Sequence, residues 1–382
     1  MNTLLRIVIF LTLCSVNAVT ALADQVHCPP DLPPPSVVTD REVWRFFGGG
    51  KSILSTAAVS KSSVYYGDNG GTLYALDRQT GRHRWSFAVP DEDASIRGGI
   101  VLLDRKVIFA SQSSGVLYAL DRGNGDVIWS IDIGAASQKN AFDVNSNTPV
   151  VIGRTLYFAS KAGSFYAINF KHGTIDWQLD LAVRFSGLPA VVNRTLLVSS
   201  DKGLHSIDLR ARKENWFHQA DNPSSPGVMR NVVAVGTRRT AAGSGSQRTV
   251  DGVDVKTGEL LWQVPYEATW VTGAVVGKKG TFYVGLSDGK SFEAIDAKSG
   301  EIIWSSPTEA NVLSRPAIKD DRVYVSAGIF RDRLGFLKAF ERNSGEELWS
   351  VQGNTFVSSP VLKDGIIYIG NRDGYFYAIR AD

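Results

Sequence analysis

Cysteine is almost absent from this sequence. Its 382 residues include two, Cys14 and Cys28. Cys14 lies in an N-terminal segment that we expect to be removed, so the mature chain cannot form an internal disulfide bond. Neither sign of charge dominates, because 41 Lys and Arg residues stand against 38 Asp and Glu residues. That balance argues against a nucleic-acid binder, which needs a concentrated basic surface. Five histidines leave little material for a zinc cluster.

Long hydrophobic runs are missing after residue 23. The segment 1–23 has one cation (Arg6), an apolar run from Ile7 to Cys14 and an Ala-Leu-Ala end. This order is typical of a cleavable signal peptide, with an uncleaved N-terminal anchor as the alternative. No small residue precedes Cys14 or Cys28, so the sequence does not predict a lipoprotein. We expect a periplasmic or secreted protein with no transmembrane segment in its mature chain.

Recognisable catalytic motifs are missing as well. The sequence contains no Walker loop, no Gly-x-Ser-x-Gly and no His-Glu-x-x-His. Its histidines are scattered without metal-ligand spacing. Residues 24–40 form a Pro-rich leader, which predicts an extended segment. The sequence therefore favours a protein that works by binding.

One short pattern recurs along the rest of the chain. Its first copy is Ala75-Leu76-Asp77, followed by Thr80-Gly81 and Trp85, and seven more copies keep the Trp in register. The mean step is about 44 residues, which is typical of propeller blades or helical arrays. The eight Trp residues, which we expect to pack between neighbouring blades, are Trp44, Trp85, Trp129, Trp177, Trp216, Trp262, Trp304 and Trp349.

Short β-branched and aromatic runs distinguish propeller blades from helical arrays. Val64-Tyr65-Tyr66 and Val107-Ile108-Phe109 are bounded by turn residues and predict strands, and no window keeps helical spacing over ten residues. Each unit predicts four strands, with Asp-x-x-Thr-Gly as the last hairpin turn. Trp then lies on the outermost strand.

The last copy is split between the two ends of the chain. Tyr377-Ala378-Ile379 begins it, but the chain ends before any Trp, and the missing Trp stands in 42–46. A sheet built from both ends closes the ring and removes its exposed edges. We therefore predict an all-β fold over residues 41–382, an eight-bladed β-propeller of four-stranded antiparallel blades closed by the N-terminal strand.

This repeat resembles the PQQ-like repeats of quinoprotein dehydrogenases and their non-enzymatic relatives. In size and layout the chain is most similar to the BamB family of outer-membrane assembly proteins. The quinoprotein resemblance implies pyrroloquinoline quinone (PQQ) with calcium beneath a pair of adjacent cysteines, a pair that this chain lacks. Asp143, Asn145 and Asn147 alternate as calcium ligands do, and the other interpretation is a polar turn before Thr148-Pro149.

The BamB resemblance implies that one inter-blade loop contacts the barrel-assembly machinery. Leu181, Val183 and Arg184 are similar in type and position, and Asp221 is the single acid of the next loop. Arg184 would pair with a partner carboxylate while the apolar residues pack around it. The alternative is that Leu181 and Val183 finish a strand and Arg184 is a solvated charge.

Two further features remain open at this stage. Trp270, outside the Trp register, would anchor a partner, stack on a flat ligand or plug the central channel. Arg97, Arg230 and Arg315 stand near the predicted starts of inner strands and would make the channel attractive to anions.

The sequence thus predicts a monomeric, non-catalytic scaffold of the cell envelope that binds other envelope proteins, without a metal or cofactor and without nucleic acid. The first alternative is a PQQ-binding protein or PQQ-dependent oxidoreductase. The second is a propeller that binds a small ligand or glycan.

Overall fold

The computed structural model describes residues 39–112, 114–134, 148–160, 162–239, 247–266, 276–329 and 334–382. The chain divides into two units, Met1–Pro35 and Ser36–Asp382, and every described residue belongs to the second unit. In these ranges the regular secondary structure consists of strands alone, and none of it is a helix able to cross a membrane.

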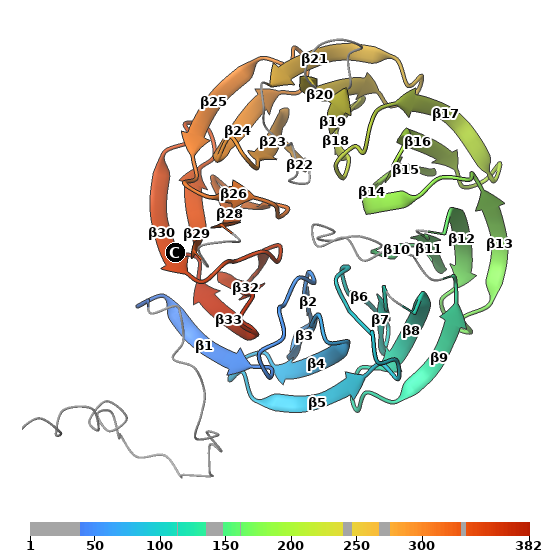
Figure 1. Ribbon diagram of the computed structural model, residues 1–382, viewed down its shortest axis with the longest axis vertical. Coiled ribbons are helices and arrows are strands. Elements are labelled where there is room, and N and C mark those ends of the chain that lie inside the picture. The colour runs from blue at the N-terminus through green and yellow to red at the C-terminus, as the bar shows by residue number, and fades with distance from the viewer. Residues whose placement is uncertain are drawn as a thin grey trace, which may run out of the picture. The chain divides into compact units, whose positions relative to one another are not determined.

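The strands form eight antiparallel sheets arranged as the blades of a ring, which confirms the predicted fold (Figure 1). Blades 1 to 4 contain, from the innermost strand outward, β2 (Ala58–Val59), β3 (Ser63–Gly67), β4 (Thr72–Asp77) and β5 (His83–Ala88); β6 (Val101–Leu103), β7 (Lys106–Ala110), β8 (Val116–Asp121) and β9 (Val127–Asp132); β10 (Val150–Ile152), β11 (Thr155–Ala159), β12 (Ser164–Asn169) and β13 (Ile175–Asp180); β14 (Phe185–Val192), β15 (Thr195–Ser200), β16 (Gly203–Asp208) and β17 (Lys213–Gln219).

Blades 5 to 8 continue the same order, with one extra short strand in blade 7. They contain β18 (Gly227–Met229), β19 (Val232–Arg239), β20 (Gln247–Asp254) and β21 (Leu260–Tyr266); β22 (Val276–Lys278), β23 (Thr281–Leu286), β24 (Ser291–Asp296) and β25 (Ile302–Pro307); β26 (Asn311–Val312), β27 (Ala317–Lys319), β28 (Arg322–Ile329), β29 (Leu334–Glu341) and β30 (Glu347–Gly353); β31 (Val361–Lys363), β32 (Ile366–Gly370), β33 (Tyr375–Arg380) and β1 (Glu42–Phe47).

Because neighbouring strands run antiparallel, the connections of every blade fall at two ends of the ring. One end, here called the loop face, carries the loops from each blade to the next and the turns between second and third strands. The other end, the turn face, carries the turns between first and second strands and between third and fourth strands.

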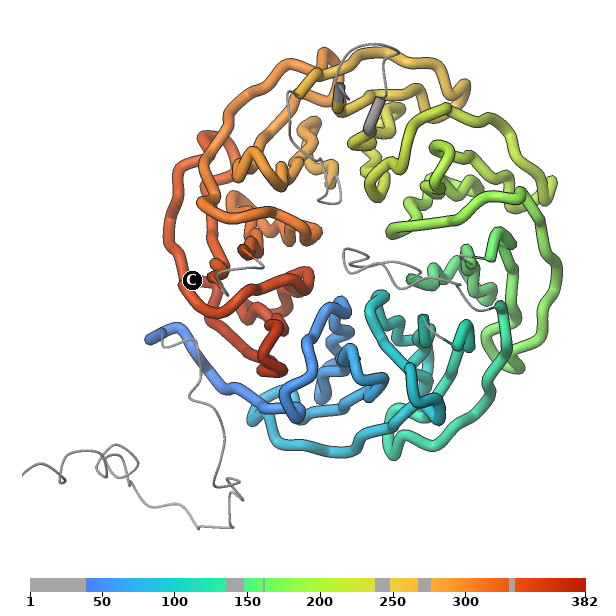
Figure 2. Tube along the Cα trace, in the orientation of Figure 1, coloured from blue at the N-terminus to red at the C-terminus, as the bar shows by residue number. Residues whose placement is uncertain are grey.

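The ring is closed by strands from both ends of the chain. β1 pairs with β33, and Trp44 lies opposite Ala378. The backbone N–H of Arg380 also donates to the carbonyl of Arg41 at 2.8 Å. Figure 2 shows the blue start of the described chain beside its red end. The predicted split blade is therefore present.

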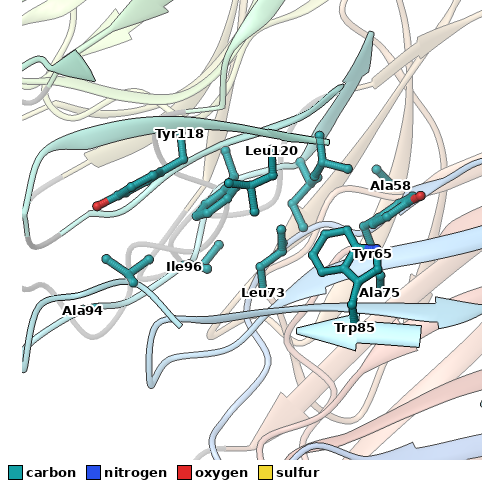
Figure 3. Close-up of a cluster of buried hydrophobic side chains, with 13 residues drawn as sticks. Ala58, Tyr65, Leu73, Ala75, Trp85, Ala94, Ile96, Tyr118 and Leu120 are labelled. Carbon is teal, nitrogen blue, oxygen red and sulfur yellow. The ribbon is translucent and has the colours of Figure 1, made fainter. Parts of the chain in front are cut away.

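Apolar side chains fill the spaces between neighbouring blades. Between blades 1 and 2, Trp85, Tyr65 and Leu73 from blade 1 pack with Tyr118 and Leu120 from blade 2 (Figure 3). The indole N–H of Trp85 donates to the carbonyl of Arg122 in the next blade at 3.1 Å. Six other register Trp residues make the same bond to the next blade, namely Trp44, Trp129, Trp216, Trp262, Trp304 and Trp349.

Every outermost strand has a β-bulge directly before its Trp. In blade 5, for example, Leu260 pairs with Val253 and Trp262 with Gly252, so Leu261 is the extra residue. The same shift occurs in all eight blades, including the one closed by β1. A bulge twists an edge strand and discourages pairing with another chain. The exposed rim of the ring is therefore protected in every blade.

Candidate functional site

Three neighbouring connections on the loop face meet at Asp201. The loop 181–184 precedes β14, the turn 201–202 precedes β16, and the loop 220–226 precedes β18. The backbone N–H of Arg184 donates to Asp201 Oδ1 at 2.8 Å, and that of Asn222 to the Asp201 carbonyl at 3.4 Å. The structure thus places Arg184 and Asp221 on adjacent loops that share Asp201, a residue that the sequence analysis missed.

The four predicted partner-binding residues differ in their availability. Val183 is buried between blades 3 and 4, and Leu181 packs against the same apolar cluster. Asp221 is half-buried and already has an interaction partner. Arg184 is exposed, and within the described ranges its guanidinium has no hydrogen-bond or ion-pair partner. The apolar pair therefore holds the loop, and the loop presents one cation.

The backbone of this loop is fixed from two sides. Lys202 Nζ donates to the carbonyl of Ala182 at 3.3 Å, and Ala182 has a positive φ of 52°. On the other side Gly163 lies so close that a Cβ there would stand 2.9 Å from the carbonyl oxygen of Val183. Arg184 is thus presented from a constrained loop, which lowers the entropy cost of binding through it.

Blade 4 contains a hydrogen-bonded chain of Ser200, His205 and Glu214. Ser200 Oγ lies 2.7 Å from His205 Nε2, and His205 Nδ1 lies 2.6 Å from Glu214 Oε1. This is the order of a catalytic triad. However, Ser200 is fully buried, and its Oγ also accepts the backbone N–H groups of Lys202 and Gly203. A nucleophile needs access to its substrate, which the buried Ser200 lacks. The hydrogen bonds of Ser200 instead hold in place the turn that carries Asp201.

Burial lowers the pKa of the His205 imidazole below its ordinary value, and the carboxylate of Glu214 acts in the opposite direction. The ring also lies between the aromatic rings of Phe185 and Phe217, with centroid distances of 5.7 and 4.8 Å. Its surroundings therefore favour the neutral imidazole.

His205 belongs to a register position that divides the ring into two halves. In every blade the Trp of the fourth strand pairs with a small residue, Ala, Ser or Gly, on the third strand. The residue directly before this small residue is Tyr in blades 8, 1, 2 and 3, but it is His, Asp, Glu or Lys in blades 4 to 7. In chain order these residues are Tyr74, Tyr118, Tyr166, His205, Asp251, Glu293, Lys338 and Tyr377. All four ionisable side chains are buried. The difference between the two halves can be read from the sequence, because this position has a fixed place relative to the Trp of each repeat.

The buried ionisable residues hold the beginnings of loops on the loop face. His218 Nε2 lies 3.2 Å from Asp251 Oδ2, and His218 stands two residues before the loop 220–226. Tyr266 Oη donates to Glu293 Oε2 at 2.7 Å across blades 5 and 6. Lys338 Nζ lies 3.4 Å from Glu309 Oε1 in the loop before blade 7. Blades 4 to 7 thus have hydrogen-bonded or ion-paired side chains at the position where the other four blades have a tyrosine.

The three arginines expected near the channel do not form one group. Arg97 is buried, and its Nε donates to Asn69 Oδ1 at 2.7 Å. Arg315, before β27, is exposed, although desolvation by surrounding protein lowers its pKa. Arg230 follows β18 and lies in the exposed turn before β19, on the turn face. It stands two residues before β19, the second strand of blade 5, and its role in lining the channel stays a prediction.

The candidate quinone and calcium residues Asp143, Asn145 and Asn147, together with Trp270, lie outside the described residues. Across the ranges that the structure does describe, no group of three His, Cys, Asp or Glu side chains is placed to hold a metal ion. The expectation of no cofactor, and its alternative of PQQ with calcium, therefore both stay untested predictions.

Comparison with known families identifies the repeat. The family model for "Outer membrane protein assembly factor BamB" matches residues 36–218, 114–269 and 246–382, which together span all eight blades. The chain belongs to this family. The bulged Trp strands and the split blade are thus features of a BamB-family propeller. No curated relative matches the sequence.

Solved structures similar to this BamB-family chain include proteins with different names. BamB from Moraxella catarrhalis is 19% identical, with 79% of this chain and 85% of that chain covered and a TM-score of 0.60. Quinohemoprotein alcohol dehydrogenase from Comamonas testosteroni is 14% identical, with 89% and 76% covered and a TM-score of 0.64. Saccharomyces cerevisiae Sqt1 is 12% identical, with 90% and 99% covered and a TM-score of 0.69. At these identities the similarity shows the fold alone.

Proposed function

We propose that this protein is a binding scaffold of the cell envelope that assists the assembly of outer-membrane proteins. The observation that carries the proposal is the family match over all eight blades. The fold adds a rigid ring whose loop face presents constrained loops, the usual location of binding residues on such a scaffold. The expected signal peptide agrees with an envelope location.

The loops around Asp201 are the proposed contact with a component of the barrel-assembly machinery. Arg184 is the exposed cation of this site, and the buried Val183 and half-buried Leu181 fix its loop. A free guanidinium on a constrained loop suits a carboxylate of the partner, because such a pair is directional and charge-assisted. Lys202, exposed on the adjoining turn, extends the cationic site.

Exchanging Arg184 for Glu tests this contact. We expect Arg184→Glu to reduce the affinity for the barrel-assembly partner at least ~10-fold, because it places like charges opposite one another. The binding is measured by co-purification from envelope extract, followed by titration with the isolated partner. Arg82→Glu is the matched control, since Arg82 is exposed on the turn face.

The two parts of the proposal fail in different ways. Equal capture of a barrel-assembly component by the wild type and Arg184→Glu would remove this loop from the interface but keep the scaffold function. If the wild type captures no barrel-assembly component, the proposed function itself is wrong.

A further inference from the structure

Basic residues gather at one place on the ring, the turns between the first and second strands of the blades. With the flanking strand ends, these eight turns hold eleven Lys and Arg residues and four acids, Asp104, Asp320, Asp321 and Asp364. Each turn contributes at least one cation: Lys61; Arg105 and Lys106; Arg154; Arg194; Arg230; Lys278 and Lys279; Lys319 and Arg322; and Lys363. The near-neutral charge of the whole chain conceals this concentration.

Most of these cations are free to meet a ligand. Arg105, Arg322, Lys106 and Lys363 contact a carboxylate, an aromatic ring or a carbonyl. The other seven have exposed side chains without hydrogen-bond or ion-pair partners in the described part of the chain, namely Lys61, Arg154, Arg194, Arg230, Lys278, Lys279 and Lys319. All eight turns lie at the same end of the innermost strands, which surround the centre of the ring (Figure 1).

The backbone holds these turns in place. The carbonyl of Arg194 accepts the backbone N–H of Leu209 at 3.0 Å, and five further blades with a two-residue inner turn make the equivalent bond. Arg230 and Lys279 have φ values of 56° and 50° at the first turn position, where Asp, Asn or Gly stands in the other two-residue turns. Long basic side chains rarely adopt this conformation. The cations are thus displayed from a rigid frame.

Exposed aliphatic side chains share this end of the ring. Among the described residues eleven large hydrophobic side chains are exposed, and ten of them lie near the turn face. Nine stand at the starts of outermost strands, including Ile303 at 50% exposure and Leu261 at 49%, and Val191 precedes the turn 193–194. Phe217 is the exception. The turn face thus combines inner cations with aliphatic side chains at its rim, where exposed acids such as Asp126, Glu259 and Glu301 also stand.

We propose that the turn face docks on an anionic phospholipid surface. Phosphate groups in a plane suit cations displayed around a ring, and aliphatic side chains at the rim enter the boundary between head groups and acyl chains. An acidic protein would suit the cations but gives no reason for ten exposed aliphatic residues at the same end. The proposal does not depend on the Arg184 loop, which lies at the opposite face.

Vesicle flotation with matched variants tests this proposal. Arg230→Asn with Lys279→Asn removes two cations from the turn face and places at both turns a residue that tolerates positive φ better than Arg or Lys, so the fold is preserved. The control is Lys290→Asn with Lys51→Asn on the loop face, where Lys290 has a φ of 47°. The probes are vesicles of phosphatidylcholine alone and of equal parts phosphatidylcholine and phosphatidylglycerol.

We expect the wild type and the control to float with the anionic vesicles only, and added salt to weaken binding. The Arg230/Lys279 variant should bind about 25-fold more weakly, about five-fold for each cation. Equal losses in both double variants, or equal binding to neutral vesicles, would overturn the proposal. So would tight binding to soluble polyglutamate without flotation, which would instead identify an acidic macromolecule as the partner.

Discussion

At the residue scale, the contact between Trp and Gly explains the repeated pattern. In six of the turns before an outermost strand, a Gly with positive φ lies against the Trp of the preceding blade, as Gly258 does against Trp216. Gly252, opposite Trp262, has a similar reason, since a Cβ there would lie 2.1 Å from Trp262. Blade 4 departs from the pattern, and Arg212 there lies 6.0 Å from the Trp177 ring centre.

Replacing Gly258 by Ala measures the Trp contact. A Cβ at this position would lie 2.7 Å from Trp216, and the φ of 78° is unfavourable for Ala. We expect a loss of about 3 kcal/mol in the free energy of unfolding, from backbone strain and overpacking together. Chemical denaturation gives the value.

Gly153→Ala is the control for backbone strain alone. Gly153 has a φ of 61°, but no atom lies within 4 Å of the Cβ position. Its expected cost is about 1 kcal/mol. Equal losses in the two variants would show that the Trp contact adds nothing.

Burial of His205 makes stability depend on pH. Its pKa is lower in the folded protein than the ordinary 6.5, so the unfolded chain binds the proton first. Stability should be complete above pH ~6.5 and fall as the pH drops below it, by at most about 1.4 kcal/mol per pH unit. We expect His205→Gln to flatten this slope in denaturation experiments between pH 7 and 5.

His172→Gln is the matched control, because His172 is exposed in the turn before β13. It should keep the slope of the wild type. An unchanged slope in His205→Gln would assign the pH dependence to another group.

At the scale of elements, strands were predictable from the sequence and loops were not. The register of Trp and Asp-x-x-Thr-Gly predicted four strands per blade, and Glu42–Phe47 closes the last sheet as predicted. These features repeat, so each copy supports the others. The loops differ from blade to blade, and their conformation depends on contacts between blades.

The candidate site shows the same limit. The BamB resemblance, together with position in the repeat, pointed to Arg184 and Asp221, but Asp201 joins their loops through hydrogen bonds to backbone groups that no pattern encodes. The burial of Val183 depends on Phe165 and Phe185 from two blades. The total charge of the chain, which argued against a nucleic-acid binder, does not reveal the cations that gather in the turns between first and second strands.

At the scale of the whole molecule, ring closure depends on one sheet built from both ends. A circular permutant that joins Asp382 to Thr39 and opens between Pro90 and Asp91 makes every blade continuous in sequence. We expect it to fold but to unfold at a lower temperature, because only packing between blades 1 and 2 then closes the ring. Thermal unfolding followed by circular dichroism measures the difference.

The control is a permutant opened between Gly153 and Arg154, in an exposed turn of blade 3. It keeps one sheet assembled from both ends, with β10 at one end of the chain and β11 at the other. If the permutant with continuous blades is as stable as this control, shared strands do not stabilise the ring.

The pairing of β1 with β33 also sets the order of biogenesis. Among the described strands, β33 alone pairs with β1. A chain emerging N-terminus first from a ribosome or an export channel therefore holds β1 unpaired until β33 has emerged. Stalling before β33, or proteolytic clipping within it, leaves an open ring, which proteases and chaperones can distinguish from the finished protein.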